Sequence, residues 1–134
     1  MKETWKLGTI VFTVLAVVLF IGYASAAPDV KAAKKNCDEM VKHGNEMIEH
    51  GKAGHLDIMS THGKAMIDSA KKAIDAIPSD NAHGKEAATH IQEAIKHAEA
   101  AVKAADAGKG KDAMTHAEEA VTHAKEGNKH AQAM

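Results

Sequence analysis

The sequence predicts an all-α protein in which an N-terminal signal peptide precedes an up-down-up-down four-helix bundle. Apolar residues recur at helical spacing in four stretches, and short breaks that contain glycine or proline separate these stretches. All ten histidines recur at seven-residue intervals, with one series in each predicted helix. Seven residues turn an α-helix through about 700°, so each series forms a stripe along one helix face.

Residues 1–26 have the features of a secretory signal peptide. Two lysines precede an apolar run over residues 7–23, which ends in the small residues Ala24-Ser25-Ala26. Pro28 disfavours a cut directly before it, so we expect cleavage after Ala26 and export of residues 27–134 to the periplasm. The alternative is an uncleaved anchor on the outer face of the inner membrane, because the run is long for a signal peptide and short for a spanning helix.

The composition of residues 27–134 narrows the partners and the kind of core. All Phe, Trp and Tyr residues lie in the leader, and every basic residue of the chain is a lysine. Without arginine or stacking aromatics, we expect no nucleic-acid binding. A core of Ala, Val, Ile, Met and a single Leu should be thin, and metal binding is one way to stabilise such a fold.

The four helices are delimited by capping residues and by breaks. Asp29 is a candidate N-cap of the first helix, and Gly51-Lys52-Ala53-Gly54 should end it. Pro78-Ser79-Asp80 should end the second helix and supply the cap of the third. Gly108-Lys109-Gly110 closes the third helix, and Asp112 helps to open the fourth. The expected helices cover about residues 29–51, 55–77, 80–107 and 111–131.

An internal repeat links the histidines to glutamates. The pattern His-x-x-Glu-x-Ile/Val-x-His occurs at residues 43–50, 90–97 and 116–123, and residues 83–90 follow it loosely. Residues 62–69 resemble a copy that has lost its acid and its second histidine. The chain therefore consists largely of a duplicated heptad that is rich in metal-binding residue types.

Histidines in this pattern point to metal binding rather than to a solvated helix surface. Two histidines seven apart are about 10 Å apart along a helix, too far to share one ion at bonds of about 2 Å. The predicted ligands are His43, His50, His55, His62, His83, His90, His97, His116, His123 and His130. Each needs a nearer partner, and glutamates that lie three residues after one histidine and four before the next qualify. These are Glu46, Glu86, Glu93, Glu119 and Glu126, although pairing with lysine explains them equally well.

The neighbouring helix is the second source of ligands. Two pairs in the first hairpin are symmetric about its turn: His50 with His55, and His43 with His62. In the second hairpin, His97 should stand level with His116 if the turn centres early. It should stand level with His123 if the turn centres on the glycines.

Sulfur-containing residues near the first two histidine series leave the oxidation state of a bound metal open. Four methionines lie three or four residues from a histidine: Met40, Met47, Met59 and Met66. Thioether beside imidazole suits Cu+, whereas packing in a core without aromatics is the alternative. Cys37 either extends this group, or is a buried inert thiol, or forms an intermolecular disulfide.

Residues 116–127, His-Ala-Glu-Glu-Ala-Val-Thr-His-Ala-Lys-Glu-Gly, resemble the repeat of the small metal-binding protein (SmbP) family. The family consists of exported, histidine-rich four-helix bundles that are associated with copper handling in bacteria. The resemblance implies several ions per chain, with Cu2+ preferred, Ni2+ and Zn2+ accepted, and a role in sequestration or delivery. It carries over to the ten histidines and to the five glutamates, whereas the methionines and Cys37 depart from it.

We therefore expect a periplasmic protein that sequesters, buffers or delivers copper, because Cu2+ binds nitrogen ligands more tightly than other divalent first-row ions. If the leader is retained, the alternative is a membrane-anchored accessory subunit that presents metal to a copper enzyme or transporter. A ferritin-like di-metal oxidase would need Glu-x-x-His motifs, and the sequence contains none. We accordingly expect a binding protein and not an enzyme.

Overall fold

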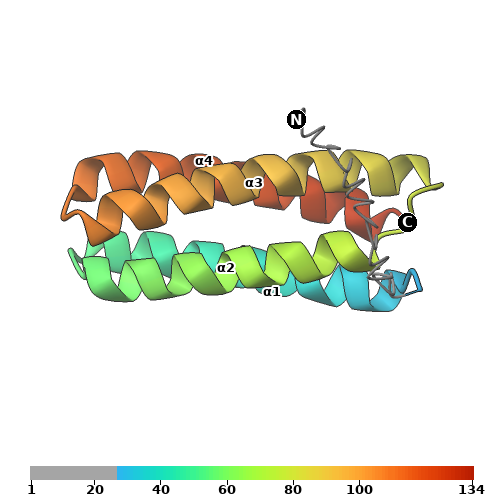
Figure 1. Ribbon diagram of the computed structural model, residues 1–134, viewed down its shortest axis with the longest axis horizontal. Coiled ribbons are helices and arrows are strands. Elements are labelled where there is room, and N and C mark those ends of the chain that lie inside the picture. The colour runs from blue at the N-terminus through green and yellow to red at the C-terminus, as the bar shows by residue number, and fades with distance from the viewer. Residues whose placement is uncertain (1–26) are drawn as a thin grey trace, which may run out of the picture.

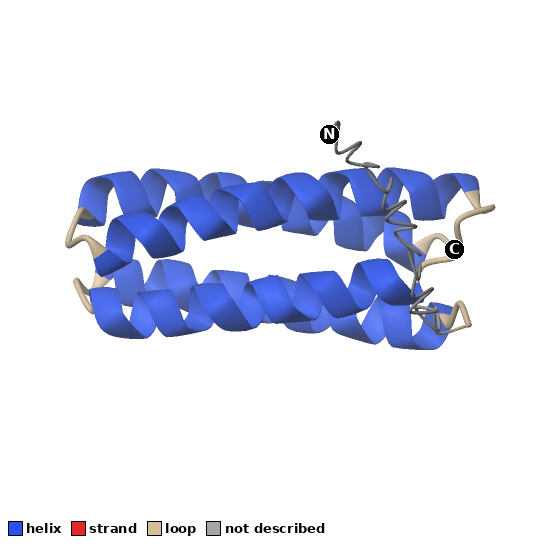
Figure 2. Cartoon of the chain, viewed as in Figure 1, coloured by secondary structure: helices blue, strands red, loops and turns tan. Residues whose placement is uncertain are grey.

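The computed structural model describes residues 27–134, which form an antiparallel four-helix bundle (Figure 1). The helices are α1 (Val30–Lys52), α2 (Leu56–Ala76), α3 (Ala82–Asp106) and α4 (Gly110–Gln132). Figure 2 shows only helices and loops over this part of the chain, and the predicted all-α bundle is confirmed. None of these four helices has an apolar stretch long enough to cross a bilayer. The predicted signal peptide or anchor, residues 1–26, lies outside the described residues.

The bundle is built from two hairpins, α1–α2 and α3–α4, whose turns use the same hydrogen-bond motif. Gly54 and Gly108 have φ angles of 77° and 72°, in the left-handed region that favours glycine. The His55 N–H donates to the His50 carbonyl at 2.9 Å, and the Lys109 N–H donates to the Ala104 carbonyl at 2.9 Å. This is the Schellman ending of a helix, so each turn fixes the register of the two helices it joins.

Side chains cap the helices that do not follow such a turn. Asp29 accepts a hydrogen bond from the Ala32 N–H at 3.1 Å, which confirms it as the N-cap of α1. The predicted cap of α3 within residues 78–80 was wrong by one position. Asn81 directly precedes α3 in extended conformation and accepts from the Gly84 N–H at 3.1 Å.

The core of the bundle consists mainly of alanine and methionine. The largest fully buried side chains are Met40, Met47, Met59, Met66, Ile91 and Cys37. The four methionines that the sequence singled out thus pack in the hydrophobic core, the alternative to ligation. Glycines next to histidines let the hairpins approach closely. A Cβ atom on Gly44 would lie 2.7 Å from Val121 Cγ2, and one on Gly63 would lie 2.5 Å from Val102 Cγ2.

Candidate metal centres

The ten histidines form two ladders of rings, one along each hairpin. In the first ladder the order is His43, His62, His50 and His55, which alternate between α1 and α2. In the second ladder the order is His83, His130, His90, His123, His97 and His116, which alternate between α3 and α4. Each ladder joins the two helices of its own hairpin, so one ladder belongs to α1–α2 and the other to α3–α4.

Contacts along each ladder alternate between two geometries. Histidines at the same level of a hairpin have ring centroids 5.8–6.0 Å apart and ring planes tilted by 30–40°. Histidines of successive levels are stacked, with centroids 5.1–5.6 Å apart and planes within 6° of parallel. The seven-residue spacing on both helices therefore produces a continuous row of imidazoles and not isolated pairs, and this row was not predicted from the sequence.

The level pairs test the predicted registers. His43 stands level with His62 and His50 with His55, as expected for the first hairpin. In the second hairpin His97 stands level with His116, so the turn centres early. The reason is that Gly108 takes the left-handed conformation, whereas Gly110 is already the first residue of α4.

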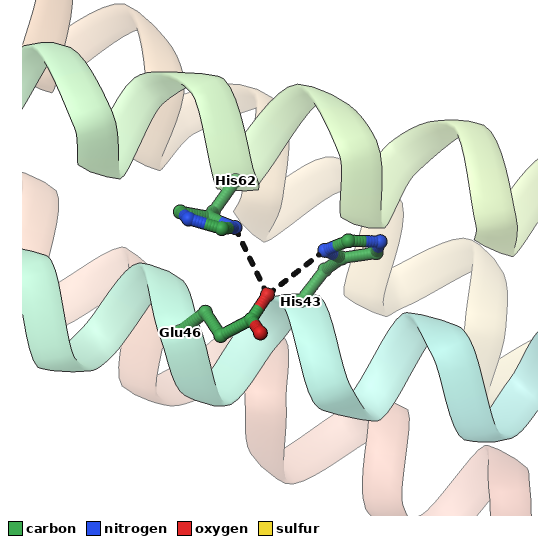
Figure 3. A group of neighbouring side chains, drawn as sticks. All are labelled: His43, Glu46 and His62. Carbon is green, nitrogen blue, oxygen red and sulfur yellow. Dashed lines mark hydrogen bonds and ion pairs between the residues drawn. The ribbon is translucent and has the colours of Figure 1, made fainter.

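Three of the five level pairs hold a glutamate between their rings. In the Glu46 triad, Oε2 of Glu46 lies 3.1 Å from Nδ1 of His43 and 3.0 Å from Nδ1 of His62 (Figure 3). Figure 3 shows the carboxylate between the two rings, with His43 and Glu46 on one helix and His62 on the other. One carboxylate oxygen thus meets an imidazole nitrogen from each helix of the hairpin.

The α3–α4 hairpin repeats this arrangement twice. In the Glu119 triad, Oε2 of Glu119 lies 2.9 Å from Nδ1 of His97 and 3.4 Å from Nδ1 of His116. In the Glu86 triad, the corresponding distances of Glu86 Oε2 are 2.8 Å to His130 and 3.9 Å to His83. In all three triads the candidate ligand atoms lie within 4.8 Å of one another.

The donor set of each triad suits a divalent transition metal ion. Two imidazole nitrogens and one carboxylate oxygen form a combination that such ions commonly bind, at about 2 Å from each donor. Within residues 27–134 the buried Nδ1 atom of His116 has no hydrogen-bond partner, and a bound ion would satisfy it. Because each triad offers three protein ligands, an ion there keeps a position for water or for a ligand that carries it away.

A lysine three residues further along the helix distinguishes two of the predicted glutamates from the three that contact histidines. Lys96 Nζ lies 2.6 Å from Glu93 Oε1, and Lys129 Nζ lies 3.8 Å from Glu126 Oε2. The hydrogen bond from Lys96 is the main reason that the pKa of Glu93 is lowered. Glu93 and Glu126 therefore pair with lysine, the alternative explanation that the sequence offered for all five glutamates. The sequence signal that separates the two groups is a lysine three residues after the glutamate.

The remaining candidates lie outside the triads. The His50–His55 pair has Ala53 and Ile58 at the positions where a glutamate would follow each histidine by three. Cys37 is fully buried in the core, and burial raises the pKa of its thiol to about 12. A protonated, inaccessible thiol is the inert form among the three roles considered for this residue.

Comparison with known proteins supports metal binding by this chain. The family model described as "Small metal-binding protein" matches residues 6–127, which is most of the chain. No curated protein matches the sequence. The matched range includes all four histidine series except His130. The chain therefore belongs to the small metal-binding protein family.

Proposed function

We propose that this protein is an exported copper-binding protein that buffers or delivers Cu2+ through its histidine–glutamate triads. The observation that carries the proposal is the convergence of two imidazole nitrogens from different helices on one carboxylate oxygen, three times in one bundle. Cu2+ is the preferred ion because it stands highest in affinity among divalent first-row ions at nitrogen and oxygen ligands. The leader at residues 1–26 supports export to the periplasm.

The exposure of the triads favours exchange of ions over catalysis. Five of the six triad histidines are half-buried and His83 is exposed, so ions can enter and leave without a channel. Three protein ligands hold an ion less completely than a closed four-ligand site would. The proposed role is therefore reversible storage, with transfer to a copper-requiring protein, and not a reaction performed on the bundle.

Protons compete with the metal at every triad. A neutral imidazole that donates from Nδ1 to the carboxylate has its proton where the ion must bind, so binding moves that proton to Nε2 or releases it. An imidazolium cannot ligate, and histidine titrates in the range between pH 5 and 8. We expect Cu2+ affinity to fall at least about tenfold between pH 7 and pH 5. Isothermal titration at the two pH values measures this change, and equal affinities would refute ligation by histidine.

The direct test removes the shared carboxylates. In E46Q/E86Q/E119Q the amide keeps the size of each side chain but ligates weakly, so we expect at least about tenfold lower Cu2+ affinity. The matched control is E49Q/E99Q/E118Q, which removes three exposed carboxylates that form no ion pair with histidine within residues 27–134. Native mass spectrometry should count three or more ions on the wild-type protein and on the control. A wild-type chain that binds no Cu2+, or a control as weak as the triple variant, would overturn the proposal.

A further inference from the structure

The level pair His90–His123, at the centre of the second ladder, is the one pair with a glutamate three residues after both of its histidines. Its rings lie 5.8 Å apart with a tilt of 31°. The pairs of the three triads have centroid distances of 5.9–6.0 Å and tilts of 30–33°. The imidazoles of this central pair are therefore arranged as they are in the triads.

The two glutamates also have the backbone position that a ligand needs. Glu93 follows His90 by three residues, as Glu46 follows His43. Glu126 follows His123 by three residues within the uninterrupted helix α4. Side chains three apart on a helix are neighbours, and the Glu46 triad shows that a glutamate at this spacing reaches both rings of a level pair.

The central pair differs from the triads in the residue that follows each glutamate by three. That residue is a lysine after Glu93 and after Glu126. In the triads the same position has Glu49, Thr89 and Thr122. Each lysine forms an ion pair with its glutamate, at 2.6 Å for Lys96 and 3.8 Å for Lys129. The lysines thus hold the carboxylates in ion pairs that a threonine cannot form.

We propose that His90, Glu93, His123 and Glu126 form a fourth metal site, latched by Lys96 and Lys129, for a divalent cation that accepts four nitrogen and oxygen ligands, such as Zn2+. The proposal rests on metal binding by the bundle, as put forward above. Two neutral imidazoles and two carboxylates carry a charge of −2, which matches a divalent ion. The site supplies four protein ligands, the number that tetrahedral Zn2+ sites use, whereas each triad supplies three.

The ion pairs of Lys96 and Lys129 lower the affinity of this site for a divalent ion and do not block it. The side chains of Lys96 and Glu93 are 67% and 40% exposed, and ion pairs this exposed contribute little. A divalent ion therefore displaces both lysines, and we expect the two pairs together to lower its affinity by about fivefold. Salt screens exposed ion pairs, so part of this loss should disappear at high ionic strength.

The test is a titration with Zn2+, followed by native mass spectrometry, and a parallel titration with Co2+. Visible absorption of Co2+ is much stronger in tetrahedral than in octahedral sites, so the difference in absorption between the wild-type protein and a variant reports the loss of a tetrahedral site. The variant K96T/K129T copies the threonines of the triads and should bind the tetrahedral ion about fivefold more tightly. The control K35T/K72T removes two lysines that pair with Glu39 and Asp68 on the other hairpin, and it should match the wild-type protein.

The carboxylate variant completes the test. E93Q/E126Q should lose one Zn2+ ion and the part of the tetrahedral Co2+ absorption that comes from this site, while the ions of the three triads remain. The proposal is overturned if E93Q/E126Q retains both, or if K96T/K129T binds no more tightly than K35T/K72T. If the wild-type chain binds no ion at all, the general metal-binding proposal fails with it. If ions bind but these variants change nothing, only the latched site fails.

Discussion

The two hairpins share one backbone plan and differ in how they use it. Gly108 lies 54 residues after Gly54 in the same turn motif, and the same shift relates the level pair of the Glu46 triad to that of the Glu119 triad. Under this shift the core methionines of α1–α2 correspond to alanines of α3–α4: Met40 to Ala94, Met47 to Ala101, Met59 to Ala113 and Met66 to Ala120. The α1–α2 hairpin has four large core methionines and four histidines, whereas α3–α4 has alanines at the equivalent core positions and six histidines.

This difference separates packing of the core from presentation of metal ligands. At the positions that correspond to His83, His90, His123 and His130, the α1–α2 hairpin has residues without an imidazole: Asp29, Asn36, Ser69 and Ala76. The α1–α2 hairpin therefore contributes more buried apolar volume to the fold, and the α3–α4 hairpin contributes two of the three triads. Four experiments test this division of roles, and they follow in order of expected effect.

Metal-induced stabilisation should be divided unequally between the hairpins. An ion whose free concentration is 100 times its dissociation constant stabilises a fold by about 2.7 kcal/mol per site. E86Q/E119Q, which weakens both triads of α3–α4 by at least about tenfold, should lose at least about 2.6 kcal/mol of the Cu2+-induced increase in unfolding free energy. E46Q should lose about half of that amount. Urea unfolding with and without Cu2+ gives both values, and equal losses would contradict the division.

Truncation of a core methionine should lower the unfolding free energy more than truncation of the alanine at the equivalent position. Met47 is fully buried, and Met47→Ala should lower the unfolding free energy of the metal-free protein by about 2–5 kcal/mol through a cavity. Ala101→Gly at the equivalent position should cost about 1 kcal/mol. Urea denaturation of both variants measures the difference. Losses of the same size would show that the two cores contribute alike.

Close approach between the hairpins can be tested at Gly44. A Cβ atom there meets Val121 Cγ2 at 2.7 Å, so Gly44→Ala should cost about 1–2 kcal/mol despite the better helix propensity of alanine. Gly110→Ala is the control, since its nearest atom, Leu56 Cδ2, lies at an ordinary 3.5 Å. The control should be neutral or slightly stabilising in thermal unfolding. A stabilised Gly44→Ala would mean that the hairpins move apart at little cost.

The smallest effect is expected at Cys37, in the core of α1–α2. Its folded-state pKa of about 12 means that the thiolate is scarce below pH 9, and the thiol is fully buried. Thiol reagents at pH 8 should therefore label the folded protein at least about 100-fold more slowly than the urea-unfolded chain. Burial of the neutral thiol stabilises the fold fully below the unfolded-state pKa, and this contribution is lost as pH rises from 9 toward 12. Rapid labelling of the folded chain would contradict the burial.

The sequence predicted the bundle and the first register because heptad spacing and symmetry about one glycine turn leave little freedom. The second register remained open, since two glycines flank Lys109 and only the backbone shows which one has positive φ. The five glutamates were likewise indistinguishable by their distance from histidine. Their separation depends on a competing partner one turn further along the helix, as Lys96 shows for Glu93. Core methionines and metal-binding methionines follow the same helical spacing, so the sequence could not separate the two roles. The burial of the four methionines in the structure assigns them to the core.

The glycine turn also determines how this architecture can change in capacity. The positive φ of Gly108 sets which histidines of α3–α4 stand level. Adding one heptad to each helix at the end away from the turn would therefore create a new level pair and leave every existing level pair in place. A single residue inserted beside the turn would instead rotate one whole stripe by about 100° and separate all the rungs of that hairpin together. The number of histidine pairs can therefore change when both helices of a hairpin gain or lose a heptad. An insertion in the turn would instead disrupt the whole row of histidines.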